Sequence, residues 1–368
     1  MPGLRCGWAT PAPIGNSGCQ TVTHSGMSPR PRLSVTVLNY NYARYLENCI
    51  DSILDQTFAD FELVIIDDCS TDESAGILRK YAGDSRVRVV RHEQNRGFVA
   101  SLIEGAEANP KTEFLTVISA DDMVVDREAF AGQVAALDGV PTASFCFAAY
   151  RVVDADGVPG TVVRAPLSDG EAMRGKDFLA RYLTRTGMHV LHSGAMIRRS
   201  AYDRAGGYRN DVRYAVDFAM WGMLALEGEV VYRSAPLYGY RVHRGQMSKS
   251  LAGVKRTLAE VLATIDAVFD KAAARQLAIG VTRGQAIRFH LFSEALPDAF
   301  AGDRMMSLRR VVAALSVHPM QALRSRAFLE TMLVLCLGNG AHAAARSLAR
   351  RVPSLAPERL SNGPVTGS

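Results

Sequence analysis

The chain has 368 residues, 48% of them hydrophobic and 21% charged, and carries a formal net charge of +5. This composition is close to that of soluble globular proteins and is sufficient for a sizeable buried core. No run of about eighteen apolar residues occurs, which argues against a membrane-spanning helix. The six cysteines are scattered without a Cys-x-x-Cys pair. This spacing argues against a zinc site and a disulfide framework, and it predicts a cytoplasmic protein.

The two ends of the chain differ in composition from the rest. Residues 1–31 are rich in Gly, Pro, Ser and Thr and lack the apolar core of a signal peptide, so we predict that they are disordered. Residues 352–368 are predicted to form a disordered tail. The segment 251–351 is predicted to be helical with a break near Pro297, and it belongs to a C-terminal third with an excess of Lys and Arg.

Strand patterns and helix patterns alternate in the first half of the chain. Short runs rich in β-branched residues are separated by segments whose apolar residues recur at helical spacing. This order predicts an α/β fold with a mainly parallel sheet and helices on both faces. Strands are expected at 33–38, 61–66, 87–90 and 114–118, and helices at 45–54, from about 71, and at 98–108.

Polar residues follow three of these strands directly. They are Asn39-Tyr40-Asn41, Asp67-Asp68 and Asp121-Asp122. Ligands of parallel sheets bind at the C-terminal ends of the strands, so we expect these residues to converge on one site. Adjacent carboxylates such as Asp121 and Asp122 disfavour each other's ionised form unless a positive charge compensates. A cation is the predicted compensation, and the alternative is a structural Asx turn.

The second half is less regular. Helices are expected at 175–185 and 214–227 and a strand at 230–232, whereas residues 238–250 form a polar segment without periodicity. No Gly-x-Gly-x-x-Gly follows the first strand, which argues against a dinucleotide-dependent oxidoreductase. The basic C-terminal third has no interleaved aromatic residues or binding motif that would favour a nucleic-acid partner.

The segment VTVLNYNYARYLENCIDSILDQTFADFELVIIDDCSTDES, residues 35–74, resembles the family 2 glycosyltransferases. The resemblance continues through Asn95-Arg96-Gly97 and SADD at 119–122, and more weakly through HSGAMIRRSAY, AVDFAMW and YRVHRGQMS. It covers residues 32–250 and implies a GT-A fold, which is Rossmann-like. It also implies transfer of a sugar from a nucleotide-sugar donor to an acceptor hydroxyl, in the synthesis of a cell-surface polysaccharide or another glycan.

The resemblance assigns a divalent metal, Mn²⁺ or Mg²⁺, to the second Asp pair. Asp122 is implied to ligate the metal, and Asp121 to hold the ribose or to reach the metal through water. His243 is implied to contact the metal or the diphosphate, and Arg241 the phosphate oxygens. For His243 the alternative is an ordinary solvated loop histidine.

Donor recognition is implied at the other strand ends. Asp67 or Asp68 would bind the nucleobase edge or the ribose, with Tyr40 packing near the base and Asn41 beside it. A carboxylate that accepts an imide N–H favours uracil or thymine, and hence a UDP-sugar. The alternatives are that one Asp of the pair caps the next helix and that Tyr40 is a core residue.

By resemblance, Asp217 is the general base that deprotonates the acceptor hydroxyl. Apolar residues surround it at the expected start of a buried helix, and a single base opposite the leaving group implies an inverting reaction. The alternatives are that Asp217 caps that helix and that Asp211 is the base. A catalytically inactive nucleotide-binding or assembly module is the competing function.

Arginines alternate with apolar stripes between Met305 and Leu337. This pattern is typical of a helix that lies on an anionic membrane surface. Such a placement suits a peripheral enzyme that extends a lipid-linked glycan at the cytoplasmic face of a membrane. The alternative is a helical domain that packs on the catalytic core with a basic outer face.

Overall fold

The computed structural model describes residues 30–184, 188–243, 251–293, 295, 304–317, 320, 323 and 326–337. The chain divides into two compact units, Met1–Thr282 and Arg283–Ser368, and each is described by itself. Apart from Arg30 and Pro31, the segments predicted to be disordered lie outside the described residues.

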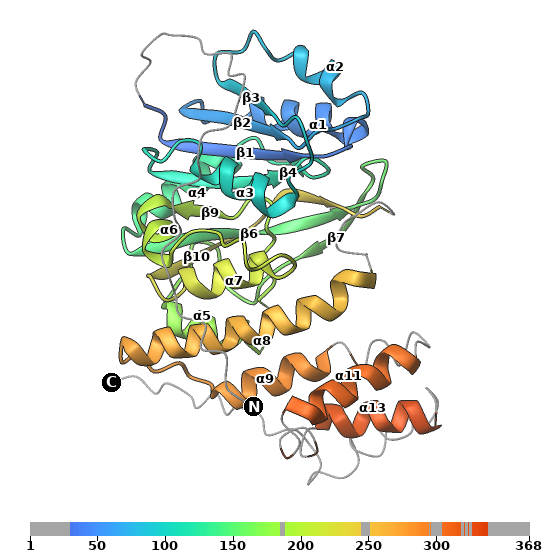
Figure 1. The fold of residues 1–368 in the computed structure, drawn as a ribbon. Helices are drawn as coiled ribbons and strands as arrows, with labels where there is room; N and C mark the ends of the chain where they lie inside the picture. Colours follow the sequence, from blue (N-terminus) through green and yellow to red (C-terminus); the bar gives the residue numbers. More distant parts are fainter. Residues whose placement is uncertain are drawn as a thin grey trace, which may run out of the picture. The chain divides into compact units, whose positions relative to one another are not determined.

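The first unit is built on a mixed sheet with helices on its faces (Figure 1). Its first half contains β1 (Leu33–Asn39), β2 (Phe61–Asp67), β3 (Val87–Arg91) and β4 (Phe114–Ser119), which are parallel neighbours in the order β3-β2-β1-β4. The strands and the parallel arrangement expected from the sequence are therefore confirmed.

The sheet continues from β4 through β9 (Met196–Arg198), β6 (Ala143–Val153) and β10 (Glu229–Arg241) to β5 (Met123–Val124). Strand β9 is antiparallel to both neighbours, whereas β6 and β10 are parallel. The short strands β7 (Pro159–Val163) and β8 (Ala172–Met173) pair with β6 and β10. Because β5 directly follows Asp122 and pairs with β10, it brings the end of β10 to the end of β4.

Helices cover both faces of the parallel part of the sheet. Alternate residues of β1 pack in one core with α1 (Ala43–Leu54) and α4 (Ala129–Gly139). The other face of β1 receives α3 (Phe98–Glu107), where a Cβ atom at Gly105 would lie 2.3 Å from Thr36 Cγ2. Only glycine permits this approach. The short helix α2 (Ser74–Arg79) packs on α1 and begins later than expected, because the Ser70 hydroxyl bonds Asn39 and Asn41 instead of capping it.

The second half of the unit buries an aromatic cluster between the sheet and the helices α5 (Gly175–Tyr182), α6 (Arg199–Ala205) and α7 (Val216–Leu224). The long helix α8 (Leu251–Ala274) packs on α7. The division into compact units falls after Thr282. The domain boundary that the sequence analysis places at residue 250 stays a prediction.

The second unit contains the helices α9 (Arg283–Ser293), α11 (Arg304–Val317) and α13 (Arg326–Leu337), and α11 packs against the other two. The helical character expected for this region is confirmed within the described residues, whereas Pro297 lies outside them. None of the helices in the described part of the chain is both long and apolar enough to cross a membrane.

Candidate active site

Asp121 and Asp122 lie in the turn between β4 and β5, and both are buried. Asp122 accepts hydrogen bonds from the backbone N–H of Arg241, at 2.9 Å from Oδ1, and from the hydroxyl of Ser193 at Oδ2. Burial, followed by the negative charge of Asp121, raises the pKa of Asp122 to about 8. The mutual disfavouring of the ionised form that the sequence analysis expected for this pair is therefore present at Asp122.

His243 lies beside this pair, just beyond the end of β10. Its Nε2 atom is 3.0 Å from Asp121 Oδ2, and its ring packs against the rings of Tyr42 and Tyr45. Burial, followed by the charges of the two aspartates, raises the pKa of the Tyr42 hydroxyl above its ordinary value. The histidine is thus a buried partner of Asp121 rather than a solvated loop residue.

Arg241 is buried, and its side chain contacts main-chain atoms of Asp121 and of a neighbouring loop. Its Nε donates to the carbonyl of Asp121 at 2.8 Å, and its guanidinium lies over the ring of Tyr45, 4.8 Å from the ring centre. A terminal nitrogen also donates to the carbonyl of Asp154. These contacts give Arg241 a role in fixing the turn, while its assignment to donor phosphate stays a prediction.

The donor chemistry around Asp121 fits a hard divalent cation. Carboxylate oxygens are the ligands that Mn²⁺ and Mg²⁺ prefer, and Mn²⁺ also accepts an imidazole such as that of His243. In the part of the chain that the structure describes, no three His, Cys, Asp or Glu side chains are arranged as a ready metal cluster. The metal and its ligand set therefore stay predictions.

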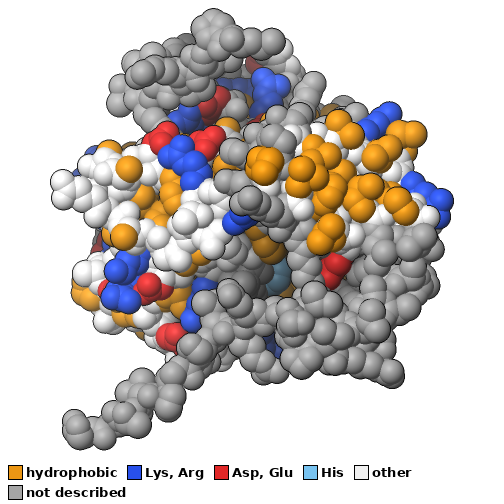
Figure 2. Space-filling model, turned by 90° about the horizontal axis from the view of Figure 1, so that it is seen from below, with side chains coloured by type: hydrophobic (Ala, Val, Ile, Leu, Met, Phe, Trp, Pro, Cys, Tyr) orange, Lys and Arg blue, Asp and Glu red, His pale blue; other side chains and the backbone are white. Residues whose placement is uncertain are grey.

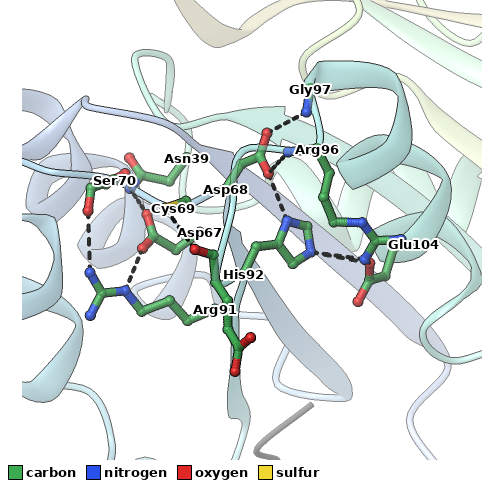
Figure 3. A network of polar contacts seen from close by, with 11 residues as sticks. Asn39, Asp67, Asp68, Cys69, Ser70, Arg91, His92, Arg96, Gly97 and Glu104 are labelled. Atoms are coloured by element: carbon green, nitrogen blue, oxygen red, sulfur yellow. Dashed lines mark hydrogen bonds and ion pairs between the residues drawn. The ribbon is translucent and has the colours of Figure 1, made fainter. Parts of the chain in front are cut away.

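The ends of β1 and β2 are joined by a polar network, shown in Figure 3. The side-chain nitrogen of Asn39 donates to Asp67 Oδ1 at 2.8 Å, and Nε of Arg91 donates to Asp67 Oδ2 at 3.1 Å. Beside them, Asn41 adopts a left-handed conformation, with φ of 57°, and its side-chain oxygen accepts the N–H of Thr71. Asp67 and Asn41 thus hold the two strand ends together, and Asp67 is fully buried.

Asp68 orders the loop between β3 and α3. Its Oδ1 accepts the backbone N–H of Arg96 and its Oδ2 that of Gly97, at 2.7 and 2.8 Å. His92 Nδ1 lies 2.7 Å from Oδ1 of Asp68, and its Nε2 lies 3.1 Å from Glu104 of α3 (Figure 3). Neither Asp67 nor Asp68 caps α2, whose N-cap residue is Glu73. Tyr40 is 46% exposed at the same edge, so it is not a core residue.

Asp217 stands in the first turn of α7, as the sequence predicted. It is the second helical residue and does not cap the helix, because the N-cap position is Ala215 and no side-chain cap bond is formed there. Just before the helix, the backbone N–H groups of residues 213–215 all donate to Oε2 of Glu260 from α8, at 2.7–3.0 Å. The Asp217 carboxylate is half-buried, and its Oδ1 atom accepts the N–H of Phe218 at 2.7 Å. The rival base, Asp211, is exposed and forms an ion pair with Arg209.

The segment His192–Ser193 connects the surroundings of Asp217 with those of Asp122. Ser193 donates to Asp122, and the adjacent His192 places its Nε2 3.0 Å from the Tyr208 hydroxyl. Burial lowers the pKa of His192, and the nearby charge of Asp217 partly opposes this effect. Two consecutive residues thus face the two predicted functional groups, because Ser193 bonds Asp122 and the adjacent His192 is influenced by the charge of Asp217.

Sequence reasoning missed several residues of this region. His92 stands directly after β3, the same strand-end position as the three clusters that were recognised, so its position was a usable signal. Ser193 and Glu260 gave no signal, because they reach the site only through the pairing of β4 with β9 and the packing of α8 on α7.

Residues 34–206 match the model of the family described as glycosyl transferase family 2. The chain is a family 2 glycosyltransferase. The matched range includes both Asp pairs, whereas Asp217, Arg241 and His243 lie beyond it. The expectation drawn from the sequence motifs is thereby confirmed for the family and for the enzyme class.

Curated relatives of this glycosyltransferase are enzymes of the same class. The glycosyltransferase GlyG of Streptococcus pneumoniae is 26% identical, and the match covers 59% of this chain and 73% of GlyG. The putative teichuronic acid biosynthesis glycosyltransferase TuaG of Bacillus subtilis is 28% identical over 36% of this chain and 60% of its own length. The hyaluronan synthase of Pasteurella multocida is 25% identical over 61% of this chain and 22% of the synthase.

Among solved structures, the TarS fragment 1–349 of S. aureus superimposes with a TM-score of 0.60 at 17% identity. The superposition covers 87% of this chain and 92% of that fragment. At this identity the likeness concerns the fold, and it confirms the GT-A architecture of the glycosyltransferase.

Proposed function

We propose that this glycosyltransferase is a metal-dependent, inverting enzyme that moves a sugar from a UDP-sugar to a hydroxyl group of a glycan acceptor. The observation that carries the proposal is the buried pair Asp121 and Asp122 at the end of β4, with His243 at 3.0 Å from Asp121. Two adjacent buried carboxylates disfavour each other's ionised form unless positive charge compensates, and a divalent cation supplies that charge.

In the proposed reaction the acceptor oxygen attacks the anomeric carbon directly. Asp217 takes the hydroxyl proton as the carbon–oxygen bond to the acceptor forms, and the bond to the diphosphate breaks on the opposite side of the sugar. This geometry inverts the anomeric configuration. Asp122, Asp121 and His243 would hold the cation, which when bound supplies the positive charge that a diphosphate leaving group requires.

The donor site in this proposal is the edge formed by Asn41, Asp67 and Asp68, with exposed Tyr40 available to pack on a nucleobase. TarS structures with UDP-GlcNAc and with UDP support a uridine nucleotide, because that enzyme shares the fold. The three observed contacts of Asp68 leave a second lone pair on its Oδ2 atom, and the side chain of Tyr40 is exposed at the same edge.

The acceptor in this proposal is a glycan or a lipid-linked glycan that is used in cell-surface polysaccharide synthesis at the cytoplasmic side of a membrane. The names of TuaG and of the hyaluronan synthase support this class, since one concerns teichuronic acid biosynthesis and the other the synthesis of hyaluronan. The sequence identity to each relative is below 30%, so neither the particular sugar nor the linkage is inferred from these two enzymes.

One observation favours the second candidate, an inactive nucleotide-binding or assembly module. Both oxygens of Asp122 already accept protein hydrogen bonds, from Ser193 and from the N–H of Arg241. A carboxylate oxygen has a second lone pair, however, so these bonds leave room for metal coordination.

A thermal-shift titration with UDP, GDP, dTDP and CMP, each with and without Mn²⁺, tests the donor and metal site that the proposal requires. A ligand that binds only the folded protein raises its melting temperature by mass action. The proposal predicts a metal-dependent shift with UDP that disappears in Asp122→Asn. No shift with any nucleotide, in a protein that melts cooperatively, would contradict the proposed donor site.

A further inference from the structure

Helix α11 of the second unit buries the polar side chains of Ser307 and Arg310 together with Val311, and it exposes a set of large apolar side chains. Ser307 is fully buried and Arg310 is 8% exposed, whereas Met305, Leu308 and Val312 expose 60%, 45% and 57% of their surfaces. A helix that faces water on its outer side shows the opposite pattern. The outward face of α11 is therefore built for contact with something apolar.

The exposed residues form one stripe along the helix. At about 100° per residue, positions 305, 308 and 312 fall within one narrow sector, opposite the buried residues. Further exposed apolar side chains follow in the same unit, at Met320 and Leu323. Figure 2 shows a face of the molecule on which apolar side chains gather in one area, with Lys or Arg side chains at part of its edge.

Arginines lie on both margins of this stripe. The same helical geometry places Arg304 on one side of positions 305, 308 and 312 and Arg309 on the other, and both arginines are exposed. Glu330 of α13, in contrast, is half-buried. Among the residues of this unit whose burial is described, the exposed charged side chains are these two arginines.

From this arrangement we propose that the outward face of α11 docks on an anionic lipid surface. The apolar stripe enters the boundary between the lipid headgroups and the acyl chains through Met305, Leu308 and Val312. On either side of the stripe, Arg304 and Arg309 bind the lipid phosphates. An apolar stripe alone fits a second copy of the chain equally well, but flanking arginines would repel those of the second copy. The inference rests on the second unit and does not depend on the donor or the metal proposed above.

Co-sedimentation of the full chain with vesicles tests this docking. Vesicles of phosphatidylcholine mixed with phosphatidylglycerol are compared with vesicles of phosphatidylcholine alone. We expect binding to the anionic vesicles, weakening as salt is raised, and little binding to the neutral ones. The double variant Leu308→Asp with Val312→Asp is expected to lose binding, and Arg304→Glu with Arg309→Glu to bind roughly tenfold more weakly.

Val158→Asp is the matched control, because Val158 is an apolar residue of the first unit with 59% exposure. It is expected to bind anionic vesicles like the unchanged chain, and circular dichroism and thermal melting verify that every variant is folded. Absence of binding to anionic vesicles, or equal binding by the α11 variants, would overturn the proposal. So would a concentration-dependent dimer that the aspartate variants abolish while vesicle binding is absent.

Discussion

The imidazole Nε2 of His243 lies 3.0 Å from Oδ2 of Asp121, although 122 residues separate them in the chain. Strand β5 explains this proximity, because it begins at Met123 and pairs with Gly239 of β10. Substitutions in the turn between β4 and β5 therefore act on His243 as well, and effects at these two positions are expected to be coupled rather than additive.

Asp217→Asn is expected to lower kcat by about 10²–10⁴-fold, because the amide cannot accept the proton of the attacking hydroxyl. The KM for the donor should change little, since the donor is assigned to other residues. Steady-state kinetics with varied donor measure both values. Asp211→Asn is the control, because Asp211 is exposed and paired with Arg209. The activity of this variant should remain near that of the unchanged enzyme.

Glu260→Ala removes the acceptor for three backbone N–H groups that precede α7. The expected loss of stability is about 1 kcal/mol, as for removal of a helix cap. Because those groups position the turn that carries Asp217, kcat should fall as well. Glu260→Gln retains an acceptor oxygen and should recover most of both losses. Equal damage in the Gln and Ala variants would contradict the capping role.

Gly105→Ala is expected to destabilise the first unit by about 1–3 kcal/mol, because the added methyl overlaps Thr36 Cγ2 at 2.3 Å. Thr36→Ser removes that methyl group, so the double variant should regain part of the lost stability. Urea unfolding measures each free energy. Gly139→Ala is the control, since a Cβ at Gly139 has no atom within 4 Å and should cost little.

Glu227 links the end of α7 to α8 by ion pairs with Lys271 and Arg275, each at 2.9 Å. Burial alone would raise its pKa, but Arg275 and Lys271 lower it below the ordinary value of 4.5. A folded-state pKa below the unfolded value means that the stabilisation is present above pH 4.5 and is lost as the pH falls through the folded pKa.

Glu227→Gln should therefore cost about 2 kcal/mol at neutral pH, between the values for surface and buried pairs. The difference from the unchanged protein should shrink as the pH is lowered below 4.5. Urea unfolding at a series of pH values measures this difference. A difference that stays constant down to strongly acidic pH would show that the ion pairs of Glu227 do not stabilise the fold.

The sequence was most informative where local pattern and topology agree. The strands β1 to β4 are continuous apolar runs, and the rule that ligands bind at strand ends led directly to Asp67, Asp68 and the pair at Asp121. The start of α7 was also predicted, because apolar residues on both sides of Asp217 indicated a buried helix.

Contacts between distant segments could not be predicted in the same way. The N–H groups before α7 are satisfied by Glu260, and Asp122 by Ser193, through packing that no local pattern encodes. The outward apolar face of α11 is a further case, because periodicity identifies a stripe but not which side of the helix is buried.

Binding of Mn²⁺ in the presence of UDP, followed by electron paramagnetic resonance, tests the central claim most directly. The account predicts that the unchanged enzyme binds one Mn²⁺ per chain with UDP, that Asp122→Asn binds it at least about tenfold more weakly, and that His243→Phe is weakened to a smaller degree. Asp156→Asn is the control, since Asp156 lies in an exposed ion pair with Arg44. Equal Mn²⁺ binding by the folded Asp122→Asn variant and the unchanged enzyme would contradict the assignment of the metal to the end of β4.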